Sequence, residues 1–215
     1  MSGFEVFNNA GSVVINSDQT HTLFDTFDTP GIVEVGAYNQ PTPFGNLREL
    51  GFTSHGWQRY QDYLYWVQLN PGAWCMPGAN MFQPGTFRVI RTTRLKSIES
   101  GFLDVFDGNG NLIWSAKSAA TMPRIMTYVD IPQNYDLNNA TWSVAPGFSP
   151  FFLWNQCPGN LSDDGEVVGY SGLCVRWDGS NIQFAYVSRY QRTYLDIFNG
   201  RGNFRLPLAK FLGHN

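Results

Sequence analysis

Residues 173–190 read LCVRWDGSNIQFAYVSRY, and this stretch decides the fold class. Its two ends are rich in β-branched and aromatic residues, and the DGSN between them contains residue types that close tight turns. In the second half, Ile182, Phe184 and Tyr186 occupy every other position, which is the spacing of side chains on one face of a strand. The stretch therefore predicts a β-hairpin.

Four other segments have the composition of strands, and no window of the chain has a convincing helical period. They are DYLYWVQL (62–69), TFRVIRTTRL (86–95), ATWSV (140–144) and GEVVGYSGLC (165–174). SHGWQRYQDYLYW (54–66) fits a helix, but its aromatic residues suit a strand at least as well. We therefore expect an all-β fold.

The length of 215 residues suits one large domain or two small ones. Two arrangements of the all-β fold fit this length. One is a single continuous, sandwich-like domain. The other is two small β-sandwich lobes, an N-terminal lobe at residues 1–100 and a C-terminal lobe at residues 101–215, with a soft boundary around 97–103.

One phrase, an apolar residue and Phe followed by Asn or Asp and then Gly, occurs three times. The copies are VFNNAGSVV (6–14), VFDGNGNLI (105–113) and IFNGRGNFR (197–205). Gly11, Gly110 and Gly202 occupy the same place in each copy, where glycine can adopt a positive φ and form a β-bulge. We expect three similar hairpins, because the copies lie too far apart for a repeat array.

Three segments lack a regular pattern. NPGAWCMPGANMFQPG (70–85) and PGFSPFFLWNQCPGNLSDDGE (146–166) contain Pro-Gly steps and no periodicity, so we expect long ordered loops. DQTHTLFDTFDTPG (18–31) is expected to be a linking segment. LPLAKFLGHN (206–215) is expected to close a strand or dock on a neighbour rather than form a helix.

The charge and the apolar pattern exclude several classes of function. Charged residues make up 14% of the chain and the net charge is −3, so the basic excess needed to bind nucleic acid is missing. No apolar run reaches membrane-spanning length, so we expect no membrane insertion. MSGFEVFNN has no basic segment followed by an apolar one, and we expect a protein that is made in the cytoplasm and is soluble.

The three cysteines, Cys75, Cys157 and Cys174, are an odd number without C-x-x-C spacing. We expect three buried thiols, because unpaired cysteine is among the most buried residue types. One bridge between Cys157 and Cys174 is the alternative.

No pattern for a metal, a cofactor or catalysis is complete. His21, His55 and His214 lack metal-ligand spacing, and GYSGL (169–173) lacks the second glycine of a serine elbow. DGNGN (107–111) places oxygen ligands at three calcium-loop positions but lacks the glycine and glutamate that follow. Carboxylates that could cleave a glycan are scattered along the chain: Asp62, Asp130, Asp163, Asp164 and Glu166. We expect no metal, no cofactor, no catalytic residue and no enzyme activity.

Aromatic residues form 16% of the chain, and some lie in or beside the two Pro-Gly segments. Flat rings there can stack on a sugar or fill a partner's pocket while neighbouring amides supply hydrogen bonds, although core packing is the more common role of such rings. The candidate ligand- or partner-binding residues are Trp74, Phe82, Phe151, Trp154, Tyr170, Asn80, Asn155 and Gln156.

The opening GFEVFNNAGSVVINSD resembles the amino-terminal hairpin of small tail proteins encoded by tailed bacteriophages. The residues that carry the resemblance are Gly3, Phe4, Val6, Phe7, Asn8, Gly11, Ile15, Asn16 and Ser17. The resemblance covers about the first 17 residues and brings no catalytic residues with it. It implies a structural component of the virion tail, at the tail tip or baseplate, that is assembled in the host cytoplasm.

The same resemblance implies other tail proteins as partners, a homo-oligomer, and contact with the host surface, where a glycan is a candidate ligand. Two alternatives from other classes stay open. A carbohydrate-binding β-sandwich module would use the loop aromatics, and a glycan hydrolase would use a pair of the scattered carboxylates.

Overall fold

The DGSN turn closes the hairpin predicted at residues 173–190. In the computed structural model, β16 (Val168–Trp177) and β17 (Ile182–Arg189) pair antiparallel. Asp178 Oδ1 accepts hydrogen bonds from the backbone amides of Ser180 and Asn181 at 2.8 and 2.6 Å, and Gly179 takes a φ of 105°. The predicted hairpin is therefore confirmed, with an Asx turn at its tip.

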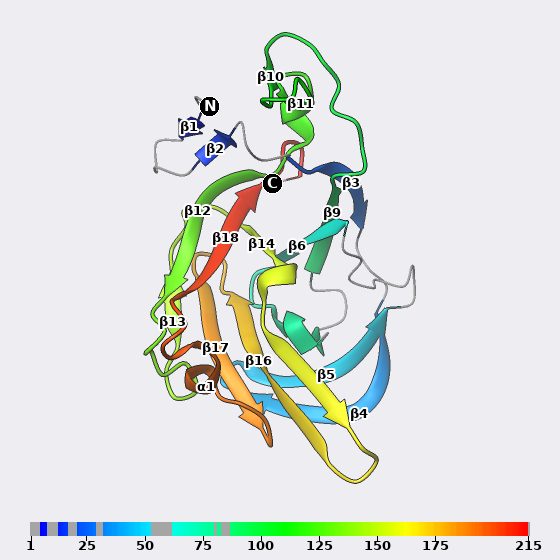
Figure 1. Ribbon diagram of the computed structural model, residues 1–215. Coiled ribbons are helices and arrows are strands. Elements are labelled where there is room, and N and C mark those ends of the chain that lie inside the picture. Colours follow the sequence, from blue (N-terminus) through cyan, green and yellow to red (C-terminus); the bar gives the residue numbers. More distant parts are fainter. Residues whose placement is uncertain are drawn as a thin grey trace.

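The structure describes residues 5–7, 13–16, 21–28, 32–52, 62–79, 81–82 and 87–214. Two large antiparallel sheets contain most of the strands (Figure 1). The first sheet has the order β12 (Arg124–Ile131), β18 (Phe204–Lys210), β14 (Phe151–Leu153), β6 (Tyr63–Leu69), β9 (Phe87–Thr93) and β3 (Leu23–Asp28).

The second sheet contains the β16–β17 hairpin. Its order is β13 (Trp142–Val144), β17, β16, β7 (Trp74–Met76), β8 (Met81–Phe82), β5 (Gly45–Phe52) and β4 (Ile32–Thr42), and β15 (Gly159–Asp163) also pairs with β16. The strands expected at 62–69, 86–95, 140–144 and 165–174 are thus confirmed as β6, β9, β13 and β16. The carboxy-terminal segment expected to close a strand contributes to β18.

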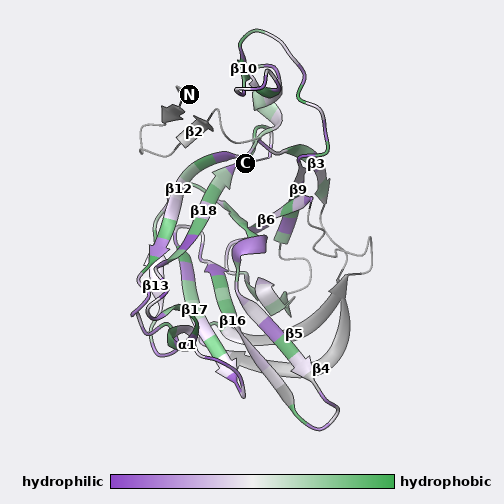
Figure 2. Ribbon diagram, viewed as in Figure 1, coloured by the Kyte–Doolittle hydropathy of each residue, from purple (hydrophilic) through white to green (hydrophobic). Residues whose placement is uncertain are grey.

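One hydrophobic core joins the two sheets. Val67, Val89 and Leu208 from the first sheet lie in the same buried cluster as Val175 and Phe184 from the second. Both faces of β6 are largely buried, which explains why its sequence is almost continuously apolar. Figure 2 shows hydrophobic stretches along the strands of both sheets. The fold is all-β and sandwich-like, as the sequence predicts.

Strands from both sides of residue 100 pair directly in each large sheet. In the first sheet β6 pairs with β14, and in the second β7 pairs with β16. The division into residues 1–100 and 101–215 stays a prediction about folding units, and the predicted boundary at 97–103 lies where the chain leaves β9 for a separate hairpin.

The two Pro-Gly segments are not simple loops. Residues 70–85 contain β7, the 3₁₀ turn η1 (Pro77–Ala79) and β8, while residues 146–166 contain β14, η3 (Trp154–Gln156) and β15. Strands this short carry too few residues to show a period. The expected linking segment at 18–31 is also wrong in part, because it contains β3 at the edge of the first sheet.

The Pro-Gly steps bring these two segments into direct contact. A Cβ atom added to Gly78 would lie 2.4 Å from the backbone nitrogen of Gly159, and one added to Gly159 would lie 2.6 Å from the carbonyl carbon of Gly78. Trp154 Nε1 donates to the carbonyl oxygen of Pro77 at 2.6 Å beside this contact. Glycine is needed at both positions because the two backbones touch.

Two of the three repeated phrases form the same hairpin. In β1 (Glu5–Phe7) and β2 (Val13–Asn16), Phe7 pairs with Val13 after a register shift. In β10 (Asp104–Phe106) and β11 (Leu112–Ser115), Phe106 pairs with Leu112 after a shift at the same place. Both expected hairpins are confirmed, although the turn around Gly11 lies outside the described residues.

The third copy does not form a hairpin. Its Ile197 and Phe198 end the short helix α1 (Tyr194–Phe198), and Gly202, with a φ of 101°, precedes β18. A reciprocal capping box between Thr193 and Asp196 begins the helix.

Cys75, Cys157 and Cys174 are free and buried, so the expected buried thiols are confirmed and the alternative bridge is not formed. Burial raises the pKa of Cys75 and of Cys174, which favours the neutral thiols.

Candidate functional site

The most prominent surface feature is a hairpin that projects from the sandwich. We call residues 99–118 the projecting hairpin; it contains β10 and β11 and lies apart from both large sheets in Figure 1. Its tip is closed by Asp107, whose Oδ1 accepts from the amides of Asn109 and Asn111 at 2.8 and 2.9 Å, and whose Oδ2 accepts from the Asn111 side chain. Gly110 has a φ of 84°, as a bulge glycine requires.

These contacts explain why DGNGN resembles part of a calcium loop. The oxygens of Asp107 serve the turn, and no group of three or more histidine, cysteine or carboxylate side chains among the described residues could hold a metal ion. The hydrogen bonds also lower the pKa of Asp107, those from the side chain and backbone of Asn111 most strongly.

A second turn holds the base of the projecting hairpin. Asp104 accepts hydrogen bonds from the amide of Gly101, at 3.0 Å, and from the hydroxyl of Ser100. Across the turn, Lys117 donates its backbone amide to the carbonyl of Gly101, at 3.3 Å. Phe102, between these anchors, has a φ of 67°, a conformation that side-chain-bearing residues rarely adopt.

The projecting hairpin exposes several large apolar side chains. Phe102 is 98% exposed, Leu103 61% and Phe106 53%, and Leu95 just before the hairpin is also exposed. Such side chains contribute little to the chain's own stability, because they stay in contact with water. A two-stranded hairpin is itself only marginally stable alone. Several exposed large apolar side chains on one small element are typical of a surface that binds another macromolecule.

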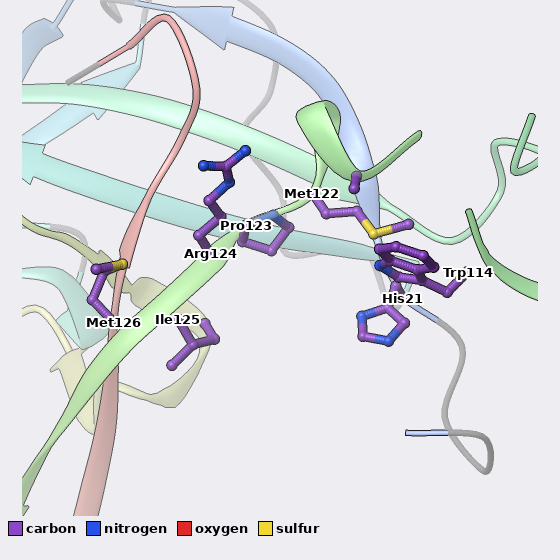
Figure 3. Close-up of a pocket in the computed structure, with 8 residues that line it drawn as sticks. His21, Trp114, Met122, Pro123, Arg124, Ile125 and Met126 are labelled. Atoms are coloured by element: carbon purple, nitrogen blue, oxygen red, sulfur yellow. The ribbon is translucent and has the colours of Figure 1, made fainter. Parts of the chain in front are cut away.

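An apolar pocket of about 230 Å³ lies where the projecting hairpin meets β12. We call it the apolar pocket. The apolar residues that line it are Trp114, Ala119, Met122, Pro123, Ile125 and Met126. Figure 3 shows Trp114 and Met122 at one end and Met126 at the other. Met126 is 38% exposed, so this end of the pocket meets the solvent.

His21 contributes an imidazole to the same pocket. Burial lowers the pKa of His21, which favours the neutral ring at physiological pH. Its Nε2 atom is buried and has no hydrogen-bond partner among the described residues. Figure 3 places the ring beside Trp114. A neutral imidazole keeps this end of the pocket compatible with an apolar occupant.

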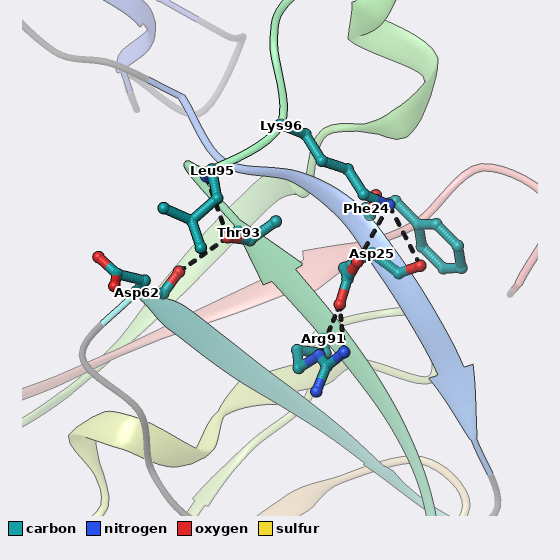
Figure 4. Close-up of polar contacts among 7 residues, drawn as sticks. All are labelled: Phe24, Asp25, Asp62, Arg91, Thr93, Leu95 and Lys96. Atoms are coloured by element: carbon teal, nitrogen blue, oxygen red, sulfur yellow. Dashed lines mark hydrogen bonds and ion pairs between the residues drawn. The ribbon is translucent and has the colours of Figure 1, made fainter.

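A network of charged side chains ties the start of the projecting hairpin to the edge of the first sheet (Figure 4). Asp25 on β3 contacts Arg91 on β9 at 2.5 Å and Lys96 at 3.1 Å, and Lys96 also donates to the carbonyl of Phe24 at 3.0 Å. Burial opposes ionisation of Asp25, but hydrogen bonds from Lys96 and Arg91 outweigh it and lower its pKa. The network therefore fixes the position of Lys96, three residues before the hairpin.

The aromatic residues predicted as binding candidates are all buried. Trp74, Phe82, Phe151, Trp154 and Tyr170 are each at most 4% exposed. Phe82 and Trp154 pack edge to face at 4.9 Å within the core. These rings pack the interior, so they do not form the exposed surface that the sequence suggested as one of two roles.

The predicted amide residues are placed differently from one another. Asn155 accepts from the amide of Tyr65 at 2.7 Å and donates to the carbonyl of Tyr63 at 3.2 Å, so it supports the backbone of β6. Gln156 is exposed, and Asn80 lies outside the described residues. The eight candidates therefore do not form one site among the described residues.

The scattered carboxylates serve separate structural contacts. Asp62 pairs with Arg94 at 3.0 Å, and Asp130 pairs with Arg205 at 3.5 Å. Asp164 accepts from two backbone amides in the turn before β16. Glu166 is exposed in that turn, and the side chain of Asp163 is outside the described ones.

Comparisons with known proteins identify one family. A family model described as a domain of unknown function, DUF8377, matches residues 1–213. No curated protein and no solved structure matches the chain. No helix of the described part of the chain is long and apolar enough to cross a membrane.

Proposed function

This chain belongs to the DUF8377 family of domains of unknown function, and we propose that it is a structural subunit of a bacteriophage tail, positioned at the tail tip or baseplate. Host-surface attachment is part of the proposal, because a subunit at that position lies next to the cell. The proposed partners are other tail proteins and further copies of the same chain.

The observation that carries the proposal is the projecting hairpin. Phe102, Leu103 and Phe106 are exposed on an element outside both large sheets. Exposed apolar residues on a rigid β scaffold are what a subunit needs to dock on its neighbours. The amino-terminal phage-tail pattern gives the proposal its biological setting, and the hairpin of that pattern has the same register as the projecting hairpin.

No observation favours the alternative of a carbohydrate-binding module. That alternative depends on Trp74, Trp154 and the other aromatic residues of the Pro-Gly segments, which are buried. Sugar-stacking rings have to be accessible, so these rings cannot bind a glycan without rearrangement of the core.

Mass spectrometry of purified phage particles tests the proposal. We expect peptides of this chain in intact particles and in isolated tails, at a fixed ratio to the major tail proteins. Their absence from particles that infect normally would contradict the proposal.

A variant series connects incorporation to the hairpin. Replacing Leu103 and Phe106 together by serine should leave the protein folded and reduce its incorporation at least about tenfold, because the docking surface loses its apolar contacts. Val167→Ser is the matched control, since Val167 is an exposed apolar residue, 46% exposed, in the turn before β16. Equal incorporation of the two variants would argue against the hairpin as the docking surface.

A further inference from the structure

Phe102 is an unusual residue for the surface of a β protein. It is almost fully exposed, and its backbone is held at a positive φ that costs an aromatic residue free energy. The hydrogen bonds that Gly101 and Ser100 donate to Asp104 fix the backbone on its amino-terminal side, and Ala116 donates to the carbonyl of Leu103 at 2.8 Å on the other. The ring is therefore presented on a fixed backbone without packing against its own chain.

The apolar pocket has the size and chemistry to receive such a ring. Its volume is about 230 Å³, and an engineered apolar cavity of about 150 Å³ binds benzene. Met122 and Met126 have flexible thioether side chains that adapt to an inserted ring and contact it favourably. Trp114 and the neutral His21 offer ring faces and edges at the other end.

The pocket and the ring of one chain do not meet, because Phe102 is exposed to solvent in the same structure that contains the pocket. A second copy is the occupant that the charges favour. Arg124 lies beside the pocket, is exposed, and makes no ion pair with another described residue. Asp104, two residues after Phe102, carries a carboxylate whose pKa is lowered, first by the amide of Gly101 and then by Ser100, so it stays ionised. A ring that enters the pocket brings this negative charge towards Arg124.

We propose that Phe102 of one copy inserts into the apolar pocket of a second copy and that this contact joins subunits of the chain. The inference rests on the proposed function as an assembling subunit and names its partner. The Phe102 side chain and the apolar pocket are different surfaces of the chain. The contact can therefore be repeated from subunit to subunit, in a closed circular oligomer or in a stack.

Sedimentation velocity of the purified full chain tests the proposal. We expect the wild-type protein to self-associate with increasing concentration. Phe102→Ser should weaken self-association at least about tenfold, because it removes the inserted ring from the centre of the contact. Tyr190→Ser is the matched control, since Tyr190 is also exposed, at 74%, and also has a positive φ, of 58°. Wild-type protein that stays monomeric, or equal self-association of the two variants, would overturn the proposal.

A complementation experiment shows whether the ring and the pocket meet each other. Ala119→Phe fills the pocket from its wall but leaves Phe102 in place. Alone, each variant should be mainly monomeric, while a mixture of Ala119→Phe with Phe102→Ser should regain a mixed dimer, because one intact ring then meets one intact pocket. Circular dichroism verifies that both variants are folded. If Ala119→Phe does not fold, Met126→Lys at the open end of the pocket replaces it. A mixture of folded variants that stays monomeric would refute the pairing.

These results are independent of the test of tail location. Self-association through Phe102 in a protein that is absent from particles would refute the tail proposal and leave the contact standing. If the protein is found in particles and its Phe102→Ser variant associates normally, the tail proposal stands and the Phe102 contact is refuted.

Discussion

Gly78 and Gly159 show at the scale of single residues why the Pro-Gly steps occur. The backbones of η1 and of the start of β15 touch at these two glycines, and neither position has room for a side chain. The sequence alone suggests turns at both steps, because Pro-Gly is a common turn signal. Only the structure shows that these two steps, with seven strands between them in the chain, meet each other.

Gly78→Ala should therefore destabilise the protein by about 3 kcal/mol or more, the upper end of overpacking effects, because the new methyl group meets backbone atoms that cannot rotate away. Gly147→Ala is the control; it has a φ of 76° and open space around it, so it should lose only about 1–2 kcal/mol through backbone strain. Urea unfolding measures both. Because Gly159→Ala disturbs the same contact, the double variant should lose less than the sum of the two single changes.

The five aromatic candidates for binding are buried, and the reason why the sequence did not show this belongs to the scale of single residues. A sequence shows which residues surround Trp74 or Trp154 but not whether their rings point inward, and short strands such as β7 and β14 have no period that would reveal it. The exposure of Phe102 was equally hidden in the sequence. This residue follows Gly101 and precedes a turn phrase, but nothing in SGFLDVF separates an exposed ring from a buried one.

At the scale of elements, the repeated phrase was predictable where local residues alone determine the structure. The turn glycine and the register shift recur in β1–β2 and in β10–β11. The third copy differs because Thr193 and Asp196 have the spacing of a helix-capping box just before it. Tyr194 is fully buried, and its packing stabilises the helix. The capping-box residues are visible in the sequence, and their effect outweighs the resemblance of residues 197–205 to the hairpin phrase.

The network around Asp25 sets how firmly the projecting hairpin is joined to β3. The pKa of Asp25 is lower in the folded protein than in the unfolded chain, so the unfolded chain binds a proton more readily as the pH falls. The stabilisation by this carboxylate is therefore complete above a pH of about 4 and is lost as the pH falls through the lower folded-state pKa.

Asp25→Asn should reduce the free energy of unfolding by about 1–2 kcal/mol at neutral pH, because Arg91 and Lys96 lose a charged hydrogen-bond acceptor. The variant should also lose less stability than the wild type between pH 6 and pH 3, a range of about three units that spans the ordinary aspartate pKa. Urea unfolding at both pH values measures the difference. Asp62→Asn is the control, because the exposed pair with Arg94 contributes little. Parallel pH profiles for Asp25→Asn and the wild type would contradict the role given to Asp25.

At the scale of the whole molecule, the fold class was predictable and the topology was not. Strand composition and turn residues were sufficient to predict an all-β protein. The order β12-β18-β14-β6-β9-β3 depends on which apolar faces fit together across the core, and pairing of strands far apart in sequence leaves no local pattern. The same limit applies to the apolar pocket, whose walls come from residues before β3, from β11, from β12 and from the segment that joins β11 to β12.

The position of β18 between β12 and β14 gives a direct test of this topology. Leu208 is completely buried between β12 and β14, so Leu208→Ala should destabilise the protein by about 2–5 kcal/mol. Leu212, only four residues later, is exposed, and Leu212→Ala should change stability by less than about 0.5 kcal/mol. Thermal unfolding compares the two variants. Similar losses would show that the last strand lies outside the core.

The place of β18 also has a consequence for biosynthesis. A ribosome delivers this strand after every other strand of the sheet, yet β12 and β14 pair through it rather than with each other. Until residues 204–210 leave the exit tunnel, the nascent polypeptide holds two open strand edges with unpaired backbone groups. The sandwich therefore cannot close until every other strand of this sheet has been made, and until then the exposed edges of β12 and β14 make the nascent chain a natural client for chaperones.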